Sequence, residues 1–187
     1  MKVPRYDLPK SAPAPLRLVQ EFVNTSDREH GRELLPGRAE LRTWLRTRNL
    51  IAQRANVQPS DVRRTRELRE ALRALLVAHS AGTTPQLAEL EALNRVADRA
   101  RVGIAFGERG VEVVVRARGV DRALGEIVAI VVAAVRDGRW AHLKACRNCH
   151  WAFYDYSRNH SATWCSMALC GNRLKTRAYR RRQAHRD

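Results

Sequence analysis

The chain has 187 residues, enough for one ordinary domain or one domain with a small module, and too few for a large multidomain enzyme. Lysine and arginine number 35 against 19 acidic residues, so the formal net charge is +16. Hydrophobic residues make up 44% of the chain, which excludes a wholly disordered protein. A positive balance of this size predicts a polyanionic partner, with nucleic acid favoured over an anionic membrane surface.

The N-terminal segment contains Pro4, Pro9, Pro13 and Pro15 and lacks the apolar centre of a signal peptide. The longest apolar run, 127–135, has nine residues, whereas a membrane-spanning helix needs about 20. We therefore expect a soluble protein of the cytoplasm, without contact to a membrane, in a compartment where disulfides are rare. All four cysteines fall within the last 42 residues, so metal binding is the leading explanation for them.

The first part of the chain has the periodicity of helices. Apolar residues recur at helical spacing in two short segments, Leu16–Val23 and Leu41–Leu45. Pro59 begins a third and longer pattern, which Gly82 ends as a C-terminal cap. Thr84-Pro85 supplies a cap and a first-turn proline for a fourth helix.

The periodicity changes to two after the fourth helix. Two alternating segments, 102–106 and 111–115, flank the turn 108–110, which predicts a β-hairpin. Gly119 closes the hairpin, and Asp121 begins a segment that is apolar on most sides. Its β-branched residues would also suit a strand, but its length and the Asp cap favour a helix. The expected fold is thus α+β, mostly helical with one hairpin.

Composition changes near residue 140. Residues 1–138 carry 24 bases and 17 acids, a net charge of +7, whereas residues 139–187 carry 11 bases and 2 acids, a net charge of +9. The second segment is therefore the more densely charged, and it holds every cysteine and most of the aromatic residues. We expect a domain of residues 1–138 followed by a small module of residues 139–187.

The cysteines form two close pairs. Two residues separate Cys146 from Cys149, and four separate Cys165 from Cys170. Two such pairs can converge on one tetrahedral Zn²⁺, and four thiolates fill its coordination shell, so the predicted site is structural rather than catalytic. The first pair precedes an alternating segment, 151–156, suited to a small hairpin, and the second pair leads into a helix. This order is typical of a treble-clef zinc finger.

The first pair also fits another pattern. Residues 146–150, Cys-Arg-Asn-Cys-His, match the attachment sequence of a c-type haem, for which Met167 would be an axial ligand. That chemistry needs export, and it leaves Cys165 and Cys170 unexplained. Zinc is the favoured cofactor, with His150 as a hairpin residue, a substitute ligand or a group that contacts a ligand.

Two segments resemble a known family. Trp164–Arg173, which ends in Cys-Gly-Asn-Arg, resembles the signature of the CGNR zinc-finger family, and the hairpin features of that family fall on Phe153, Asp155 and the turn 158–159. Leu18–Thr25 resembles the opening of the ABATE-type domain of the same family. Members are described as stress-induced transcription regulators, so the resemblance implies DNA binding and no catalytic activity.

A basic helix is expected after the second cysteine pair. On a helical wheel Met167, Cys170, Leu174 and Ala178 form a narrow apolar stripe with bases on both flanks. A helix packed by this stripe would project its bases into a major groove or along phosphates. Arg173 would otherwise donate to the cysteine sulfurs or a helix cap, and 180–182 would otherwise be a solvated tail. The residues predicted to contact nucleic acid, duplex DNA first, are Arg173, Lys175, Arg177, Arg180, Arg181 and Arg182.

Three other functions stay open for the finger. Its aromatic residues would suit base stacking on RNA, although they would also form the small core that a zinc module needs. A finger that binds protein would show no salt-dependent binding of nucleic acid. A metal-dependent nuclease would use His160 as a base and Asp155 as a ligand, but no second acidic cluster supports this chemistry, so we expect no enzyme.

The first domain contains no catalytic motif: a phosphate-binding loop, a nucleophile elbow and a dinucleotide fingerprint are all lacking from the sequence. Glu67 and Glu70 lie among arginines and are expected to form ordinary ion pairs. Asn24 is expected to line a pocket or, more simply, to cap a helix. Sensing a small-molecule ligand and forming a homodimer are the roles open to this domain.

Overall fold

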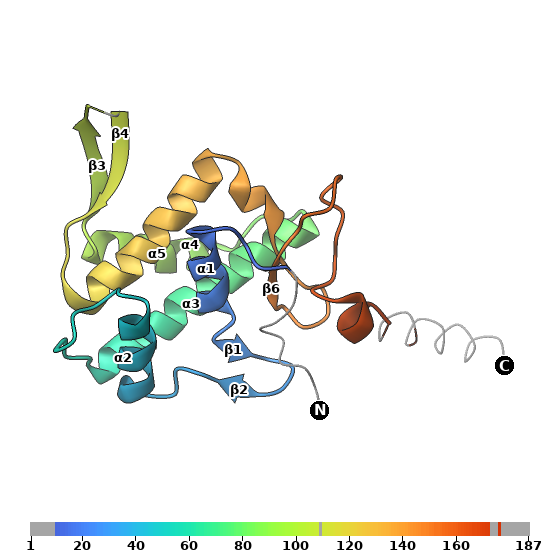
Figure 1. Cartoon of the computed structure of the whole chain (residues 1–187), viewed down its shortest axis with the longest axis horizontal. Helices are drawn as coiled ribbons and strands as arrows, with labels where there is room; N and C mark the ends of the chain where they lie inside the picture. Colours follow the sequence, from blue (N-terminus) through green and yellow to red (C-terminus); the bar gives the residue numbers. More distant parts are fainter. Residues whose placement is uncertain (1–9, 109, 173–175, 177–187) are drawn as a thin grey trace.

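The computed structural model describes residues 10–108, 110–172 and 176 (Figure 1). Helices dominate the first two thirds of the chain, and three short antiparallel hairpins complete the fold. The α-helices are α1 (Leu16–Val23), α2 (Arg38–Thr47), α3 (Pro59–Ala81), α4 (Leu87–Arg99) and α5 (Gly119–Arg136). The hairpins pair β1 (Ser26–Asp27) with β2 (Arg32–Glu33), β3 (Val102–Gly107) with β4 (Gly110–Val115), and β5 (Leu143–Ala145) with β6 (Ala152–Tyr154). The predicted α+β class is confirmed.

Helix α3 is the longest element, and its ends follow the sequence signals. The Gln58 side chain caps the first turn while the Asp61 carboxylate accepts a bond from the Gln58 backbone N–H at 2.7 Å, and Pro59 occupies the first helical position. At the other end Gly82 adopts φ 69°, the left-handed conformation that costs glycine least. The predicted bounds of this helix are confirmed.

Two helices begin at other residues than expected. Helix α4 begins at Leu87, and its N-cap is Gln86, which has an extended conformation. Pro85 therefore lies before the helix and not in its first turn. The Thr83 N–H donates to the Ala78 carbonyl at 2.9 Å, so Thr83 belongs to the C-terminal cap of α3. Helix α5 begins two residues earlier than Asp121, at Gly119.

The main core joins the helical body to β5 and β6. Its fully buried side chains include Leu16 and Phe22 of α1, Leu72 of α3 and Ile127 of α5. The same cluster takes in residues of the third hairpin, namely Leu143, Ala145, Ala152 and Tyr154. The third hairpin therefore packs on the helices as part of one continuous core.

A second, smaller core surrounds the cysteines. Side chains alternate along the chain at β6, so Ala152 and Tyr154 face the main core while Trp151 and Phe153 pack with the cysteines. Trp164 is half-buried against the same cluster. Of the aromatic residues expected around the metal, Tyr154 belongs instead to the main core, and Tyr156 is 63% exposed.

Within the described ranges, no helix has the length and apolar character that crossing a membrane requires.

Candidate metal centre

Four cysteine sulfurs meet at one point of the second core. Cys146 and Cys149 lie in the turn between β5 and β6, and Cys165 and Cys170 lie on either side of the start of η3 (Met167–Gly171), a short π-helix. The four Sγ atoms all lie within 4.8 Å of one another. The Sγ of Cys149 is 3.7 Å from that of Cys165 and 3.6 Å from that of Cys170.

These distances fit a tetrahedral zinc ion. With Zn–S bonds of about 2.3 Å, the sulfurs of a tetrahedron lie about 3.8 Å apart. A disulfide needs sulfurs about 2.05 Å apart, and all four cysteines are free. The set consists of soft sulfur donors alone and is fully buried, which suits one closed, structural zinc site.

Ionisation of all four thiols would also require a cation. Hydrogen bonds from Cys149 and then Cys165 lower the pKa of Cys146, while hydrogen bonds with Cys146 and then Cys149 raise the pKa of Cys165. The buried cluster on its own therefore resists holding four negative charges at once. A bound divalent ion supplies the compensating charge that lets all four thiols ionise.

The first cysteine pair sits in a tight knuckle. The Cys146 N–H donates to the Trp151 carbonyl at 3.0 Å, and the His150 N–H donates to the Cys146 carbonyl at 2.9 Å. The hairpin expected within 151–156 is instead formed between β5 and β6, with this knuckle as its turn. That prediction was wrong because the chain turns away directly after Tyr154, at Asp155, and leaves no second strand on that side.

His150 does not belong to the metal cluster. In the described part of the chain, the four cysteines are the only group of three or more ligand-type residues that converge. His150 instead contributes through its backbone. It adopts a left-handed conformation with φ 57°, and its carbonyl accepts a hydrogen bond from Arg73 at 3.0 Å. Burial, followed by the charges of Arg28 and Arg73, lowers the pKa of its imidazole.

The second cysteine pair is held by Ser166 and a close-packed glycine. The Ser166 Oγ accepts from the Leu169 N–H at 3.3 Å, and its carbonyl accepts from the Cys170 N–H at 2.9 Å. A Cβ on Gly171 would lie 2.5 Å from the Met167 Sδ, so any larger residue there would push Met167 aside. Ser166 thus holds the turn around the second cysteine pair through its side chain and its carbonyl.

Asp155 organises the loop between the two cysteine pairs. Its carboxylate, almost fully buried, accepts bonds from the Lys144 ammonium at 2.9 Å, from the backbone N–H and Oγ of Ser157 at 2.9 and 2.7 Å, and from the Ala162 N–H at 2.9 Å. Burial alone would raise the pKa of this carboxyl, but the bonds from Lys144 and Ser157 outweigh it and the pKa is lowered. Asp155 is thus occupied within the fold and is not available as the metal ligand of a nuclease. The other nuclease candidate, His160, is exposed and packs edge-on against His142.

We expect Asp155→Asn to destabilise the zinc-loaded protein by about 3 kcal/mol, since the amide cannot match the charged bonds and leaves Lys144 half-buried without its partner. Because the pKa of Asp155 is lowered on folding, this contribution is present above pH ~4 and is lost as the pH falls toward the lowered pKa. Urea unfolding of both proteins at neutral pH measures the difference. Asn159→Asp, in the same loop and exposed, is the control, and equal stability of wild type and Asp155→Asn would contradict the role.

Asn24 connects the helical body to the finger. It follows α1, and its buried side chain pairs with the Ala152 backbone as a strand would: the Ala152 N–H donates to Asn24 Oδ1 at 2.8 Å, and Asn24 Nδ2 donates to the Ala152 carbonyl at 2.9 Å. Gln20 donates to the same carbonyl at 3.2 Å. Asn24 also lines a hollow, one of the two roles expected for it.

That hollow has a volume of about 350 Å³ and lies between α1, α2 and the start of β6. Arg48 forms part of the wall of the hollow. Its guanidinium lies 4.2 Å from the centre of the Trp44 ring and 3.0 Å from a carboxylate oxygen of Glu21. The residues around it are Ser11, Arg17, Gln20, Glu21, Asn24, Thr25, Leu34, Trp44, Arg48 and Trp151.

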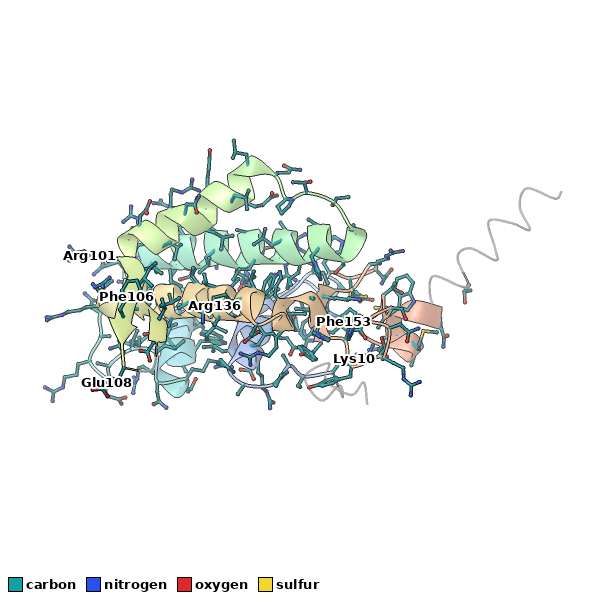
Figure 2. All side chains as sticks on the ribbon, turned by 90° about the horizontal axis from the view of Figure 1, so that it is seen from above. Lys10, Arg101, Phe106, Glu108, Arg136 and Phe153 are labelled. Carbon is teal, nitrogen blue, oxygen red and sulfur yellow. The ribbon has the colours of Figure 1, made fainter. Side chains whose placement is uncertain are left out.

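Lys10 ties the start of the described chain to the second core. Its ammonium lies 4.7 Å from the centre of the Phe153 ring and donates to the Trp164 carbonyl at 2.8 Å (Figure 2). The predicted nucleic-acid contacts Arg173, Lys175, Arg177, Arg180, Arg181 and Arg182 lie outside the described residues. Helical backbone is described at Asn172 and Thr176, where the Thr176 hydroxyl donates to the Asn172 carbonyl at 2.9 Å.

A helical body joined to a hairpin knuckle with four converging thiols defines a zinc-finger protein with an additional α+β domain. The chain belongs to the ABATE family, described as "Putative stress-induced transcription regulator", whose model matches residues 16–138. The CGNR zinc finger model matches residues 142–183. No curated protein matches the chain. The resemblance drawn from the sequence is confirmed at both ends, and neither family description names an enzyme.

Proposed function

We propose that this chain is a cytoplasmic transcription regulator whose zinc finger binds duplex DNA. Cys146, Cys149, Cys165 and Cys170 would be the ligands of the zinc. Residues 139–187 would form the DNA-binding module, and residues 1–138 would form the regulatory domain. The family descriptions support regulation and a zinc finger, and binding of duplex DNA is the step that goes beyond them.

The observation that carries the proposal is that the chain is held by the metal centre directly before the basic segment in the sequence. The cysteine cluster, Ser166 and Gly171 fix the chain as far as Asn172. The six predicted contacts, Arg173 to Arg182, follow directly in the sequence, so they start from an anchored turn. Arg147 and Arg158 of the finger are also exposed. With four thiolates and one Zn²⁺ counted, the formal net charge of residues 139–187 falls from +9 to +7, but it is packed into 49 residues, so this module is the most densely basic part of the chain.

We expect binding to a DNA duplex to weaken steeply with salt. Five or six phosphate contacts would give log K against log salt a slope of about −5. The double variant Arg177→Ala, Arg180→Ala should reduce this slope by about 2 and weaken binding. Fluorescence anisotropy of a labelled duplex over a range of NaCl concentrations measures both.

Arg63→Ala with Arg95→Ala is the matched control, since both side chains are exposed on helices of the other domain. Unchanged binding by the Arg177, Arg180 variant would refute the role of the basic segment. Preference for RNA in competition would assign the finger to RNA, and absence of salt-dependent binding to either polymer would leave a protein-binding finger.

We place the sensing of a small molecule in the larger domain, at the hollow beside α1. The observation in its favour is that the hollow is lined by residues of both family segments, with Trp151 from the finger and Trp44 from the helical body. An occupant would touch Asn24 and Trp151, next to the bonds that join the helical body to β6. Binding there would therefore act directly on the junction between the two segments.

A further inference from the structure

Exposed apolar side chains are concentrated on three elements that precede the finger in the sequence, namely α4, the β3–β4 hairpin and α5. Ten large hydrophobic residues are exposed in the described part of the chain, and seven of them come from α4, the β3–β4 hairpin and α5. These three elements pack on one another, and Figure 2 shows Phe106 at the end of the molecule opposite to Phe153. The seven residues, called the hairpin patch below, are Leu87, Leu90, Ile104, Phe106, Val111, Val132 and Val135.

The hairpin has one wholly apolar face. Residues that pair across an antiparallel hairpin point to the same side. The pairs Val102–Val115, Ile104–Val113 and Phe106–Val111 therefore share a face, and each of the six side chains is apolar. The opposite face holds the pairs Gly103–Val114, Ala105–Glu112 and Gly107–Gly110, and the Arg116 side chain lies over Gly103 there. The larger apolar side chains of the hairpin are therefore concentrated on one face.

That apolar face is covered only at its base. The Val115 side chain packs against α5 at Gly125, where an added Cβ would come within 2.8 Å of it. Toward the tip the two strands project away from the helices (Figure 1). Ile104 is 62% and Phe106 83% exposed as a result. On α5, Val132 lies about two turns beyond Gly125 on the same side and Val135 nearly three turns beyond it, and both are exposed.

The area of the patch is close to what one subunit gives to a stable dimer. Summed over the seven residues, the exposed apolar area is on the order of 700 Å², compared with about 800 Å² per partner in a standard interface. The hairpin patch consists of the projecting β3–β4 hairpin and of a helical surface on α4 and α5, on which the hairpin of a second copy can pack. A two-fold axis would place each hairpin on the α4–α5 surface of the other copy, which is the self-complementarity that such a dimer requires.

Charge also favours a second copy as the occupant. A chain with a net charge of +16 repels its copies, so association needs a surface whose own net charge is small. The segment 87–136 carries eight arginines and seven acidic residues, a net charge of +1, against +9 for residues 139–187. Joining through the hairpin patch would keep the two fingers, at the other end of the molecule, apart (Figure 1).

We propose that the hairpin patch is the interface of a homodimer, with Phe106 as its central anchor. This interface is separate from the proposed contact with DNA, since no residue of the patch belongs to residues 139–187. It covers the apolar face of the hairpin and presents two basic fingers on one assembly.

Sedimentation equilibrium of the zinc-loaded wild type is expected to give twice the chain mass at micromolar concentrations. Phe106→Glu should weaken association by at least about 30-fold, the effect of losing one hot-spot aromatic residue. Because Phe106 is exposed within the single chain, the variant should keep the zinc content and helical circular dichroism of the wild type. Tyr156→Glu, on the finger and 63% exposed against 83% for Phe106, is the control and should remain dimeric.

A second measurement locates the contact. A photoreactive phenylalanine analogue placed at position 106 should cross-link two chains, and the cross-linked peptides should come from residues 87–136. Monomeric wild type at these concentrations, an undiminished dimer of Phe106→Glu, or cross-links confined to the finger would each overturn the proposal. Binding of the Phe106→Glu monomer to a short duplex, measured in parallel, tests the finger independently of the dimer.

Discussion

Replacing Cys165 by serine is expected to abolish zinc binding and to unfold the finger. Serine offers a hard hydroxyl in place of a thiolate, and the three remaining sulfurs cannot complete the shell. Structural zinc contributes about 10–16 kcal/mol to the folding of zinc-finger peptides at neutral pH. The second core contains few apolar residues apart from Trp151, Phe153, the half-buried Trp164 and the cysteines themselves, so no other interaction replaces that contribution.

Elemental analysis should find one zinc per chain in the wild type and none in Cys165→Ser. Hydrogen exchange should show loss of protection at Cys146 and His150, whose amide bonds close the knuckle, and at Ala152, whose amide bonds Asn24. Protection at Leu72 and Leu76 in the middle of α3 should be kept. Ser161→Ala, exposed in the same segment, is the control. A metal-free wild type with protected knuckle amides would refute the structural role.

The elements that sequence predicted well are those with strong local signals. Helix α3 has a cap, a first-turn proline and a terminal glycine, and the β3–β4 hairpin alternates apolar residues on both strands. The alternation over 151–156 does mark β6, but its partner was mispredicted because β5 has only three residues, too few for periodicity to register. Its pairing depends on the metal knuckle between the strands and on Asn24, which is distant in sequence.

The cysteine cluster was predictable because the spacing of its ligands reports the chemistry directly. The residues that position the cluster were less so. Asp155 could be singled out only through a family motif, and no motif marks Arg73. Glu70 was expected to make an ordinary ion pair, but it lies between Arg28, Arg69 and Arg73. The available signal was the helical register: Arg69 and Arg73 fall on the stripe of α3 that also holds Thr65, Leu72 and Leu76, so they face the core.

Arg73 is the residue through which α3 holds both α1 and the finger. It is 1% exposed, and its guanidinium donates to the carbonyls of Val23 at 2.6 Å, Ser26 at 2.9 Å and His150 at 3.0 Å. Its Nε donates to Glu70 at 3.1 Å. The planar fork of five N–H donors suits this role, whereas the ammonium of a lysine is a point donor that cannot reach three separated carbonyls together.

We expect Arg73→Met to reduce the free energy of unfolding by about 3–5 kcal/mol, because methionine fills much of the space but leaves three carbonyls without this donor and removes one of the three arginines around Glu70. Arg73→Lys should recover less than half of this loss. Urea unfolding of the zinc-loaded proteins measures the change. Arg63→Met, on the exposed side of the same helix and paired only with Glu67 among the described ion pairs, should cost less than about 0.5 kcal/mol.

The hydrogen bond from Arg73 to His150 allows two roles of Arg73 to be separated, because its acceptor belongs to the zinc knuckle and not to the helical body. If Arg73 positions the knuckle, Arg73→Met should also release zinc to a chelator faster than the wild type does, at a urea concentration where both proteins remain folded. If Arg73 supports only the helical body, the unfolding free energy falls while the rate of zinc release is unchanged. Equal unfolding of Arg73→Met and Arg63→Met would contradict both roles.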